Sequence, residues 1–130
     1  MSGLRRIILD LQNTLFADAV ARALGSANSD FRVQQTERPG ESAELCRLFR
    51  PYALLMEVTS YPGWRLEERL AVREQVRQTA PDCKIVLMCD ENSERELAER
   101  IRQAKKDGLI DQFIYGSISS TYLAAVMDAL

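Results

Sequence analysis

The chain has 130 residues, of which 46% are hydrophobic and 28% charged, as in an ordinary soluble domain with one core. Its net charge of −2 gives no basic field, which argues against nucleic-acid binding. The absence of histidine removes the commonest general base and metal ligand. No apolar run is long enough to span a bilayer and no signal peptide is visible, so we expect a cytoplasmic protein without membrane contact.

Short apolar segments alternate with helical segments along the sequence. We expect strands at residues 6–10, 31–35, 52–57, 84–89 and 111–115. We expect helices at residues 15–26, 42–49, 66–78, 93–107 and 120–130. The first helix is expected to start from an N-cap at Asn13 or Thr14 and to bury a stripe that contains Leu15. The fourth is expected to start from a capping box at Ser93, and residues 39–40 read as a turn.

Five strand–helix units with right-handed crossovers predict an α/β fold. The expected architecture is a doubly wound, five-stranded parallel sheet with strand order 2-1-3-4-5 and helices on both faces. Residues 31–35 alternate between apolar and polar side chains, which is typical of an edge strand. We expect one domain over residues 1–130.

The most informative segment is residues 51–63, PYALLMEVTSYPG. Residues 53–56 read as a strand that is buried on both faces, and Glu57 is the acid that ends it. Open α/β sheets bind ligands in the crevice at the carboxyl ends of their strands. A buried acid is costly, so Glu57 is expected to be solvated, paired or functional.

This segment and the five strand–helix units resemble the receiver domain of two-component response regulators (CheY-like). Receivers show Pro-Asp, four apolar residues and Asp, and then a Met-Pro-Gly loop. In this chain the corresponding residues are Pro51, Tyr52, ALLM and Glu57, and then Tyr61-Pro62-Gly63. The resemblance covers essentially the whole chain. It implies a bacterial, cytoplasmic signalling module of a two-component or phosphorelay system.

The resemblance also implies a chemistry. Receivers phosphorylate themselves on the aspartate that ends the third strand, and a Mg²⁺ ion is held there by two acids at the end of the first strand. A lysine after the fifth strand pairs with the phosphoryl group. A threonine or serine after the fourth strand senses it.

This chain departs from that pattern at the acceptor and at the acid pair. Glu57 stands where the aspartate is expected, and its extra methylene moves the carboxylate by about 1.5 Å. A misplacement of about 1 Å in a reacting group can already cost about 100-fold in rate. The acid pair is reduced to Asp10, followed by Leu11 and Gln12. We expect a vestigial acidic pocket at Asp10 and Gln12 in which Asp10 is a weak Mg²⁺ candidate, with no metal or other cofactor bound. The alternative is that Asp10 caps a backbone turn.

The switch positions depart as well. The hydroxyl position falls on Met88, with Cys89 beside it. If Phe113 takes the place of the switch aromatic, the Lys-Pro pair of receivers falls on Gly116-Ser117. A shift of one residue moves it to Tyr115 and Gly116, and neither register restores a lysine. Phe113 and Tyr115 are candidates for a rotating aromatic switch, with core packing as the alternative for Phe113.

The three cysteines, Cys46, Cys83 and Cys89, form no CxxC motif. We interpret them as small buried residues in a reducing compartment. Cys89 lies nearest to the expected crevice. A redox role there requires a lowered thiol pKa.

We interpret the chain as a pseudo-receiver, a non-enzymatic module that acts by protein–protein contact. Glu57 then supplies a permanent negative charge that fixes one signalling state or leaves control to something other than phosphate; alternatively it is only a solvated acid at a strand end. A homodimer through the fourth helix, fifth strand and fifth helix is a further expectation.

Two other hypotheses remain open. One is a working, atypical receiver that is phosphorylated with Mg²⁺, and the other is a flavodoxin-like cofactor carrier, although residues 11–15 lack the glycines of a phosphate loop.

Overall fold

A computed structural model describes residues 3–38 and 40–130 of the chain. The strands are β1 (Arg5–Asp10), β2 (Phe31–Gln35), β3 (Ala53–Glu57), β4 (Lys84–Cys89) and β5 (Gln112–Tyr115). The helices are α1 (Thr14–Ala27), α2 (Ser42–Phe49), α3 (Leu66–Thr79), α4 (Arg95–Lys106) and α5 (Ser120–Asp128). All ten expected elements are present, and their bounds lie within two residues of the predicted ones. The predicted turn at residues 39–40 lies partly outside the described residues.

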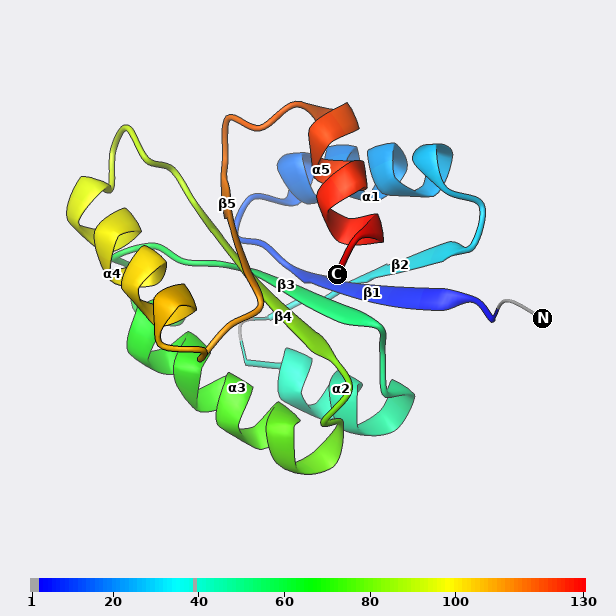
Figure 1. Cartoon of the computed structure of the whole chain (residues 1–130), viewed down its shortest axis with the longest axis horizontal. Helices are drawn as coiled ribbons and strands as arrows, with labels where there is room; N and C mark the ends of the chain where they lie inside the picture. Colours follow the sequence, from blue (N-terminus) through cyan, green and yellow to red (C-terminus); the bar gives the residue numbers. More distant parts are fainter. Residues whose placement is uncertain (1–2, 39) are drawn as a thin grey trace.

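The five strands form one parallel sheet in the order β2-β1-β3-β4-β5, as predicted. Figure 1 shows α1 and α5 on one face of this sheet and α2, α3 and α4 on the other. The strand order places β1 and β3 at the centre and leaves β2 and β5 as the two edges. The carboxyl ends of the central strands therefore meet at one rim of the sheet, where receivers carry their site.

Each face of the sheet carries its own apolar cluster. Ile8 and Met56 belong to the cluster under α2, α3 and α4, whereas Leu9 and Leu55 belong to the cluster under α1 and α5. Side chains alternate between the two faces of a strand, so strands covered on both faces are apolar throughout. Among the described residues, the polar or charged side chains that are buried are those of Asp10, Ser42 and Arg69.

Helix α1 buries a different stripe from the predicted one. Ala17, Val20 and Leu24 face the core, whereas Leu15 is 81% exposed. Alanines are spread along this helix, so its hydrophobic pattern fits more than one rotation about the axis, and packing against the sheet selects among them. The predicted N-cap is confirmed: the Asn13 side chain accepts the backbone N–H of the third helical residue.

The capping box predicted at Ser93 is wrong. Helix α4 begins at Arg95, and its N-cap residue makes no side-chain capping bond. Instead, the Asp90 carboxylate accepts the backbone N–H groups of Asn92 at 2.9 Å and of Ser93 at 3.4 Å. These bonds form a turn that uses the Ser93 amide before the helix starts. In the described part of the chain, no helix is long and apolar enough to cross a membrane.

Candidate functional site

A crevice of about 400 Å³ lies at the carboxyl ends of β3, β4 and β5. It is the place where the sequence predicts a site. Its floor comes from the strand ends and its walls from the start of α1 and from the loops after β4 and β5. The lining residues are Asn13, Phe16, Glu57, Met88, Cys89, Asp90, Asn92, Gly116 and Ser117.

Glu57 ends β3 and lines this crevice. Its Oε1 atom accepts the backbone N–H of Gln12 at 2.6 Å. A carboxylate bonded to a backbone N–H makes a short, charge-assisted hydrogen bond. Glu57 therefore ties the end of β3 to the loop that follows β1. Gln12 contributes its backbone to this bond, and its side chain is exposed.

Asp10 and Glu57 lie on opposite faces of the sheet. In the register between β1 and β3, Asp10 pairs with Met56, whose side chain belongs to the cluster under α2, α3 and α4. Asp10 follows Ile8 by two residues and points to that same face, whereas Glu57, next to Met56, points to the other. Asp10 is only 1% exposed and does not line the crevice.

The Asp10 carboxylate is held by a buried arginine. Nη1 of Arg69 lies 2.8 Å from Oδ2 of Asp10, and Nη2 lies 3.3 Å from Oδ1. The Ser42 hydroxyl donates a further bond to Oδ2 at 3.0 Å. Both charged side chains and the serine are almost completely buried. This bidentate geometry is the strong form of an arginine–carboxylate pair.

Arg69 also binds the ends of two strands through their backbone. Its Nη2 atom donates to the Asp10 carbonyl at 3.1 Å, and its Nε atom donates to the Glu57 carbonyl at 2.8 Å. One guanidinium from α3 thus joins the ends of β1 and β3. With Ser42 at the start of α2, four elements meet at this buried charge pair.

The residues around Asp10 do not fit a magnesium ion. Mg²⁺ prefers an open octahedral shell of oxygen ligands. Both carboxylate oxygens of Asp10 are engaged by Arg69, so an ion placed there would lie beside a guanidinium charge. Glu57 points to the opposite face of the sheet. In the described ranges, no group of three acidic or cysteine side chains is arranged to hold a metal.

The sequence interpretation did not identify Arg69 or Ser42 as part of the site. A signal for Arg69 was present: it lies three residues after Leu66 and three before Val72, on the stripe of α3 that is buried. An arginine on a core stripe needs a buried acid as its partner. Asp10, which directly follows the apolar residues 7–9 of β1, was the acid that could provide it.

Met88 and Cys89 form the β4 side of the crevice. Met88 pairs with Glu57 in the sheet. Met88 and Cys89 are both buried. Neither carries the hydroxyl that the resemblance implies. Burial, reinforced by the charge of Glu91, raises the pKa of the Cys89 thiol to about 12. The thiol is therefore protonated near neutral pH, which does not support the redox role considered for Cys89.

The loop after β5 closes the crevice from the other side. The Gly116 N–H donates to the Cys89 carbonyl at 2.9 Å, and the Ser117 hydroxyl donates to Glu91 at 2.6 Å. These bonds tie the loops after β4 and β5 together. Among the described residues that line the crevice, none is a lysine or an arginine. The loop after β5, where the resemblance implies a phosphoryl-binding lysine, contributes Gly116 and Ser117 to the lining.

The two candidate switch aromatics lie together outside the crevice. Phe113 is half-buried and packs against the core under α4. Tyr115 is 37% exposed, and its ring meets the Phe113 ring edge-on at 4.9 Å between centroids. Its hydroxyl is hydrogen-bonded to Arg102 of α4. Tyr115 is thus held in an outward position on the α4 side of β5.

Comparison with known proteins gives structural neighbours. No protein-family model and no curated protein matches the sequence. The receiver domain of the putative response regulator NarL from Mycobacterium tuberculosis is 20% identical, with a TM-score of 0.74 over 98% of this chain and 97% of that one. A response regulator from Thermotoga maritima is 17% identical, with a TM-score of 0.73 over 96% and 95%. HP1043, an orphan response regulator of H. pylori, is 15% identical, with a TM-score of 0.72 over 99% and 98%. The chain has the flavodoxin-like fold of CheY-type response regulator receiver domains.

Proposed function

We propose that this chain is a receiver-like signalling module that works without phosphorylation and acts through contacts with other proteins. Its fold is that of receivers of two-component systems. The proposal adds that the phosphoryl chemistry of that fold has been lost and its scaffold kept. A cytoplasmic location is part of the same proposal.

The observation that carries the proposal is the buried pair of Asp10 and Arg69. By resemblance, the end of the first strand is where receivers hold Mg²⁺, the ion that their phosphorylation needs. In this chain the acid at that place is neutralised by a guanidinium at 2.8 Å, inside the protein. Removing either partner would leave an unpaired buried charge, so the pair does not open at low cost. This arrangement supports a module whose state is independent of Mg²⁺.

Glu57 supports the same conclusion on the crevice side. Its Oε1 atom already accepts the backbone N–H of Gln12 at 2.6 Å. A phosphoryl donor would have to displace this bond and would find no lysine in the described lining. Arg102 holds the Tyr115 ring in an outward position, on the surface through which receivers signal. Together these contacts favour one permanent signalling state.

The intact mass after incubation with acetyl phosphate tests the proposal. The chain is incubated with and without Mg²⁺, beside an active receiver as the control. We expect no phosphoryl adduct on this chain while the control is modified. A Mg²⁺-dependent adduct would instead show a working, atypical receiver. The variant Glu57→Gln would then decide whether Glu57 is the acceptor, because the amide cannot form an acyl phosphate.

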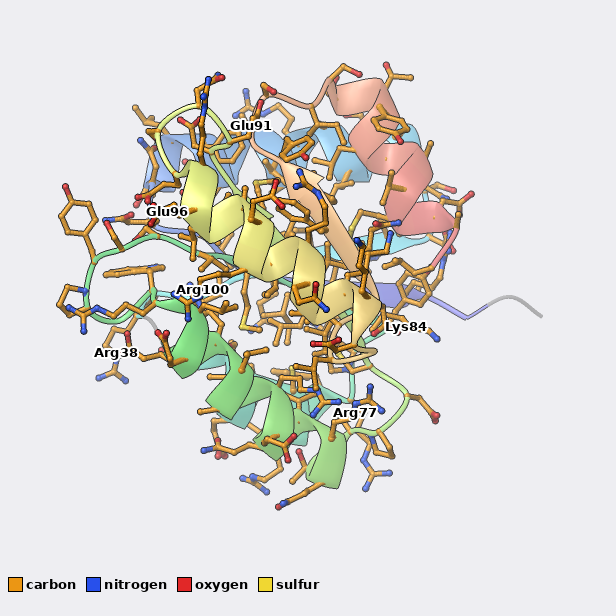
Figure 2. The ribbon with its side chains drawn as sticks, turned by 60° about the vertical axis from the view of Figure 1, so that its left-hand side comes forward. Arg38, Arg77, Lys84, Glu91, Glu96 and Arg100 are labelled. Carbon is orange, nitrogen blue, oxygen red and sulfur yellow. The ribbon has the colours of Figure 1, made fainter. Side chains whose placement is uncertain are left out.

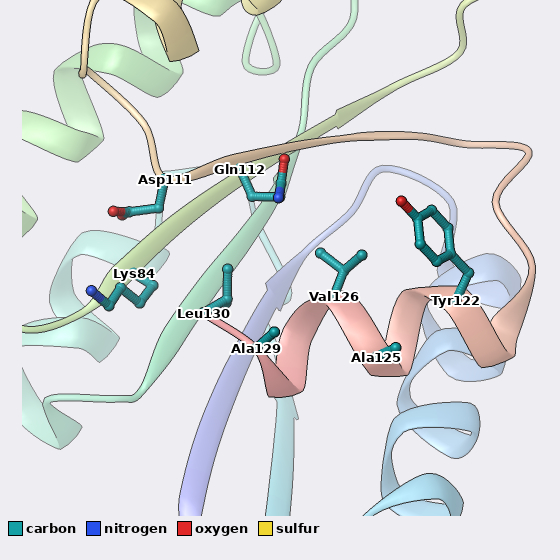
Figure 3. A pocket seen from close by; sticks show the side chains of 8 residues that line it. All are labelled: Lys84, Asp111, Gln112, Tyr122, Ala125, Val126, Ala129 and Leu130. Atoms are coloured by element: carbon teal, nitrogen blue, oxygen red, sulfur yellow. The ribbon is translucent and has the colours of Figure 1, made fainter.

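The face formed by α4, β5 and α5 is the surface through which we propose that two copies meet. A hollow of about 430 Å³ lies between α5 and the starts of β4 and β5. Figure 3 shows the side chains that line it, among them Tyr122, Val126 and Leu130. Tyr122 is 62% exposed. Charged side chains of both signs lie on the β5 side of helix α4: Arg102 is bonded to Tyr115 and to Glu99, and Lys105 donates to Gln112 at 2.7 Å. Apolar contacts ringed by charges of both signs suit a self-complementary interface.

Sedimentation equilibrium tests this second part of the proposal. We expect a monomer–dimer equilibrium that is lost in Tyr122→Arg. The matched control is Tyr61→Arg, because Tyr61 is equally exposed and lies in the loop after β3. A wild-type chain that stays monomeric, or a dimer that survives Tyr122→Arg, would contradict the proposed interface.

A further inference from the structure

Helix α2 leaves an apolar flank uncovered at the β2 edge of the sheet. Its buried side carries Ser42 and Cys46. Leu45, Leu48 and Phe49 follow one another at helical spacing on the flank beside that buried side. Leu48 is 58% exposed and Phe49 43% exposed. Burying large apolar side chains stabilises a protein, so two of them exposed side by side mark a contact surface.

The flank is surrounded by positive charge. The Arg6 guanidinium of β1 lies over the Phe49 ring, 4.5 Å from its centroid, and also donates to Gln34 of β2. Arg50 follows Phe49 directly at the end of α2, and Arg32 lies on β2. In the part of the chain that the structure describes, none of these three arginines forms an ion pair with an acid. We call this region the α2 flank surface; it comprises Arg6, Arg32, Leu45, Leu48, Phe49 and Arg50.

The sign of this surface is opposite to that of the whole chain. The chain carries a net charge of −2, yet three arginines that form no ion pair in the described ranges, Arg6, Arg32 and Arg50, belong to this surface. Glu44 lies one helical turn before Leu48, and its carboxylate is paired with Arg47 of the same helix, so its charge is offset there. An anionic partner is therefore attracted to this surface and not to the molecule as a whole.

Arg50 also has an unusual backbone. Its φ of 45° and ψ of 63° are left-handed, and it is the only non-glycine residue with positive φ in the described ranges. Glycine usually occupies such a position after a helix, because other residues are strained there. An arginine at this position places a cation directly after Phe49 in the chain, at some cost in stability.

We infer that the α2 flank surface binds an amphipathic helix of another protein, with leucine-like residues on one face and acidic residues along its edges. The three apolar side chains match the face of such a helix, and the arginines match its edges. A strand added to the β2 edge is less suited, because Arg32 already donates to the Ser29 carbonyl at 2.8 Å and the Phe31 carbonyl at 3.0 Å. This inference does not depend on whether Glu57 is phosphorylated.

Three designed helical peptides of about 18 residues test the inference. The first has a leucine stripe and glutamate edges, the second has the same stripe with lysine edges, and the third has glutamate edges with glutamine in place of leucine. Binding is measured by fluorescence anisotropy and located by NMR on the labelled chain. We expect the first peptide to bind at least about tenfold more tightly than the others. The amide signals of Arg6, Gln34, Phe49 and Arg50 should shift.

Two variants separate binding from folding. Phe49→Ala should weaken the first peptide about tenfold. Arg50→Gly should weaken it by up to about fivefold and leave the melting temperature unchanged or higher, because glycine relieves the left-handed backbone. Tyr61→Ala, at an exposed aromatic in the loop after β3, is the control and should bind normally.

Three results would overturn the inference. They are equal binding of the glutamate and lysine peptides, binding that is insensitive to both Phe49→Ala and Arg50→Gly, and amide shifts confined to another face. Vesicles of phosphatidylcholine with phosphatidylserine are tested in parallel. Sedimentation with these vesicles that requires Phe49, without binding of the first peptide, would identify a membrane surface as the occupant instead.

Discussion

Replacing Arg69 by methionine should destabilise the domain more than any other single change to a charged residue that we consider. Methionine keeps an unbranched apolar stem like that of arginine and removes the charged guanidinium. The Asp10 carboxylate would then be buried with the Ser42 hydroxyl as its remaining side-chain partner, and the Glu57 carbonyl would lose a donor at 2.8 Å. Breaking a buried ion pair in this way costs about 3–5 kcal/mol.

That cost is a large share of the free energy of unfolding of a typical domain, about 5–15 kcal/mol. With a urea dependence of about 2 kcal/mol per molar, the unfolding midpoint of Arg69→Met should fall by about 2 M. Urea titration followed by far-UV circular dichroism and by fluorescence of the single tryptophan, Trp64, measures it. Arg77→Met is the matched control, because Arg77 is exposed on the same helix (Figure 2). It should change stability by less than about 0.5 kcal/mol.

The double variant Asp10→Asn, Arg69→Met completes the test. It removes both charges, and the asparagine keeps an acceptor for the Ser42 hydroxyl. Because replacing both partners of a buried pair is often nearly neutral, it should recover most of the stability lost in Arg69→Met. A single variant as stable as the wild type, or a double variant less stable than Arg69→Met alone, would falsify this account of the buried pair.

Three further outcomes are expected. Glu57→Ala should speed hydrogen exchange of the Gln12 amide, because the variant removes its acceptor at 2.6 Å, and unchanged exchange would contradict the proposed tie. Native Cys89 should not react with a thiol reagent at about pH 8 and should react once the chain is unfolded in urea, since its pKa is raised to about 12; labelling of the native thiol would count against this. The Arg5 guanidinium lowers the pKa of Asp30 below its ordinary 3.8, so this pair stabilises the fold above that pH and its contribution is lost as pH falls through the folded-state value. Melting temperatures of Arg5→Gln and wild type should therefore converge on acidification, and a constant gap would refute the assignment.

The fold could be predicted from the sequence because its signals are local. Buried strands such as residues 84–89 are almost continuously apolar, and prolines and polar caps separate them from helices of ordinary length. Rotation about a helix axis was less well determined. In α1, the many alanines left Leu15 and Val20 equally plausible as core residues, and only packing selects Val20.

The candidate site could be predicted only in part. The position of Glu57 follows from the end of a strand, which a local pattern reveals. The pair of Asp10 and Arg69 joins residues 59 positions apart, and it depends on which face of β1 meets which side of α3. Local periodicity cannot supply such a contact. The spacing of Arg69 from Leu66 and Val72 indicates the buried stripe of α3, but it does not identify Asp10 as the partner.

The buried guanidinium also bears on how the domain opens. Arg69 binds the ends of β1 and β3 and the Asp10 carboxylate at once. If α3 separates from the sheet, the Arg69 guanidinium is exposed and the Asp10 carboxylate loses its charged partner. Partly opened forms in which only α3 has left therefore carry nearly the full electrostatic penalty with little gain in chain entropy. Local opening at this end of the sheet is suppressed relative to unfolding of the whole domain. The buried pair of Asp10 and Arg69 therefore couples the unfolding of β1, β3, α2 and α3 into one cooperative event.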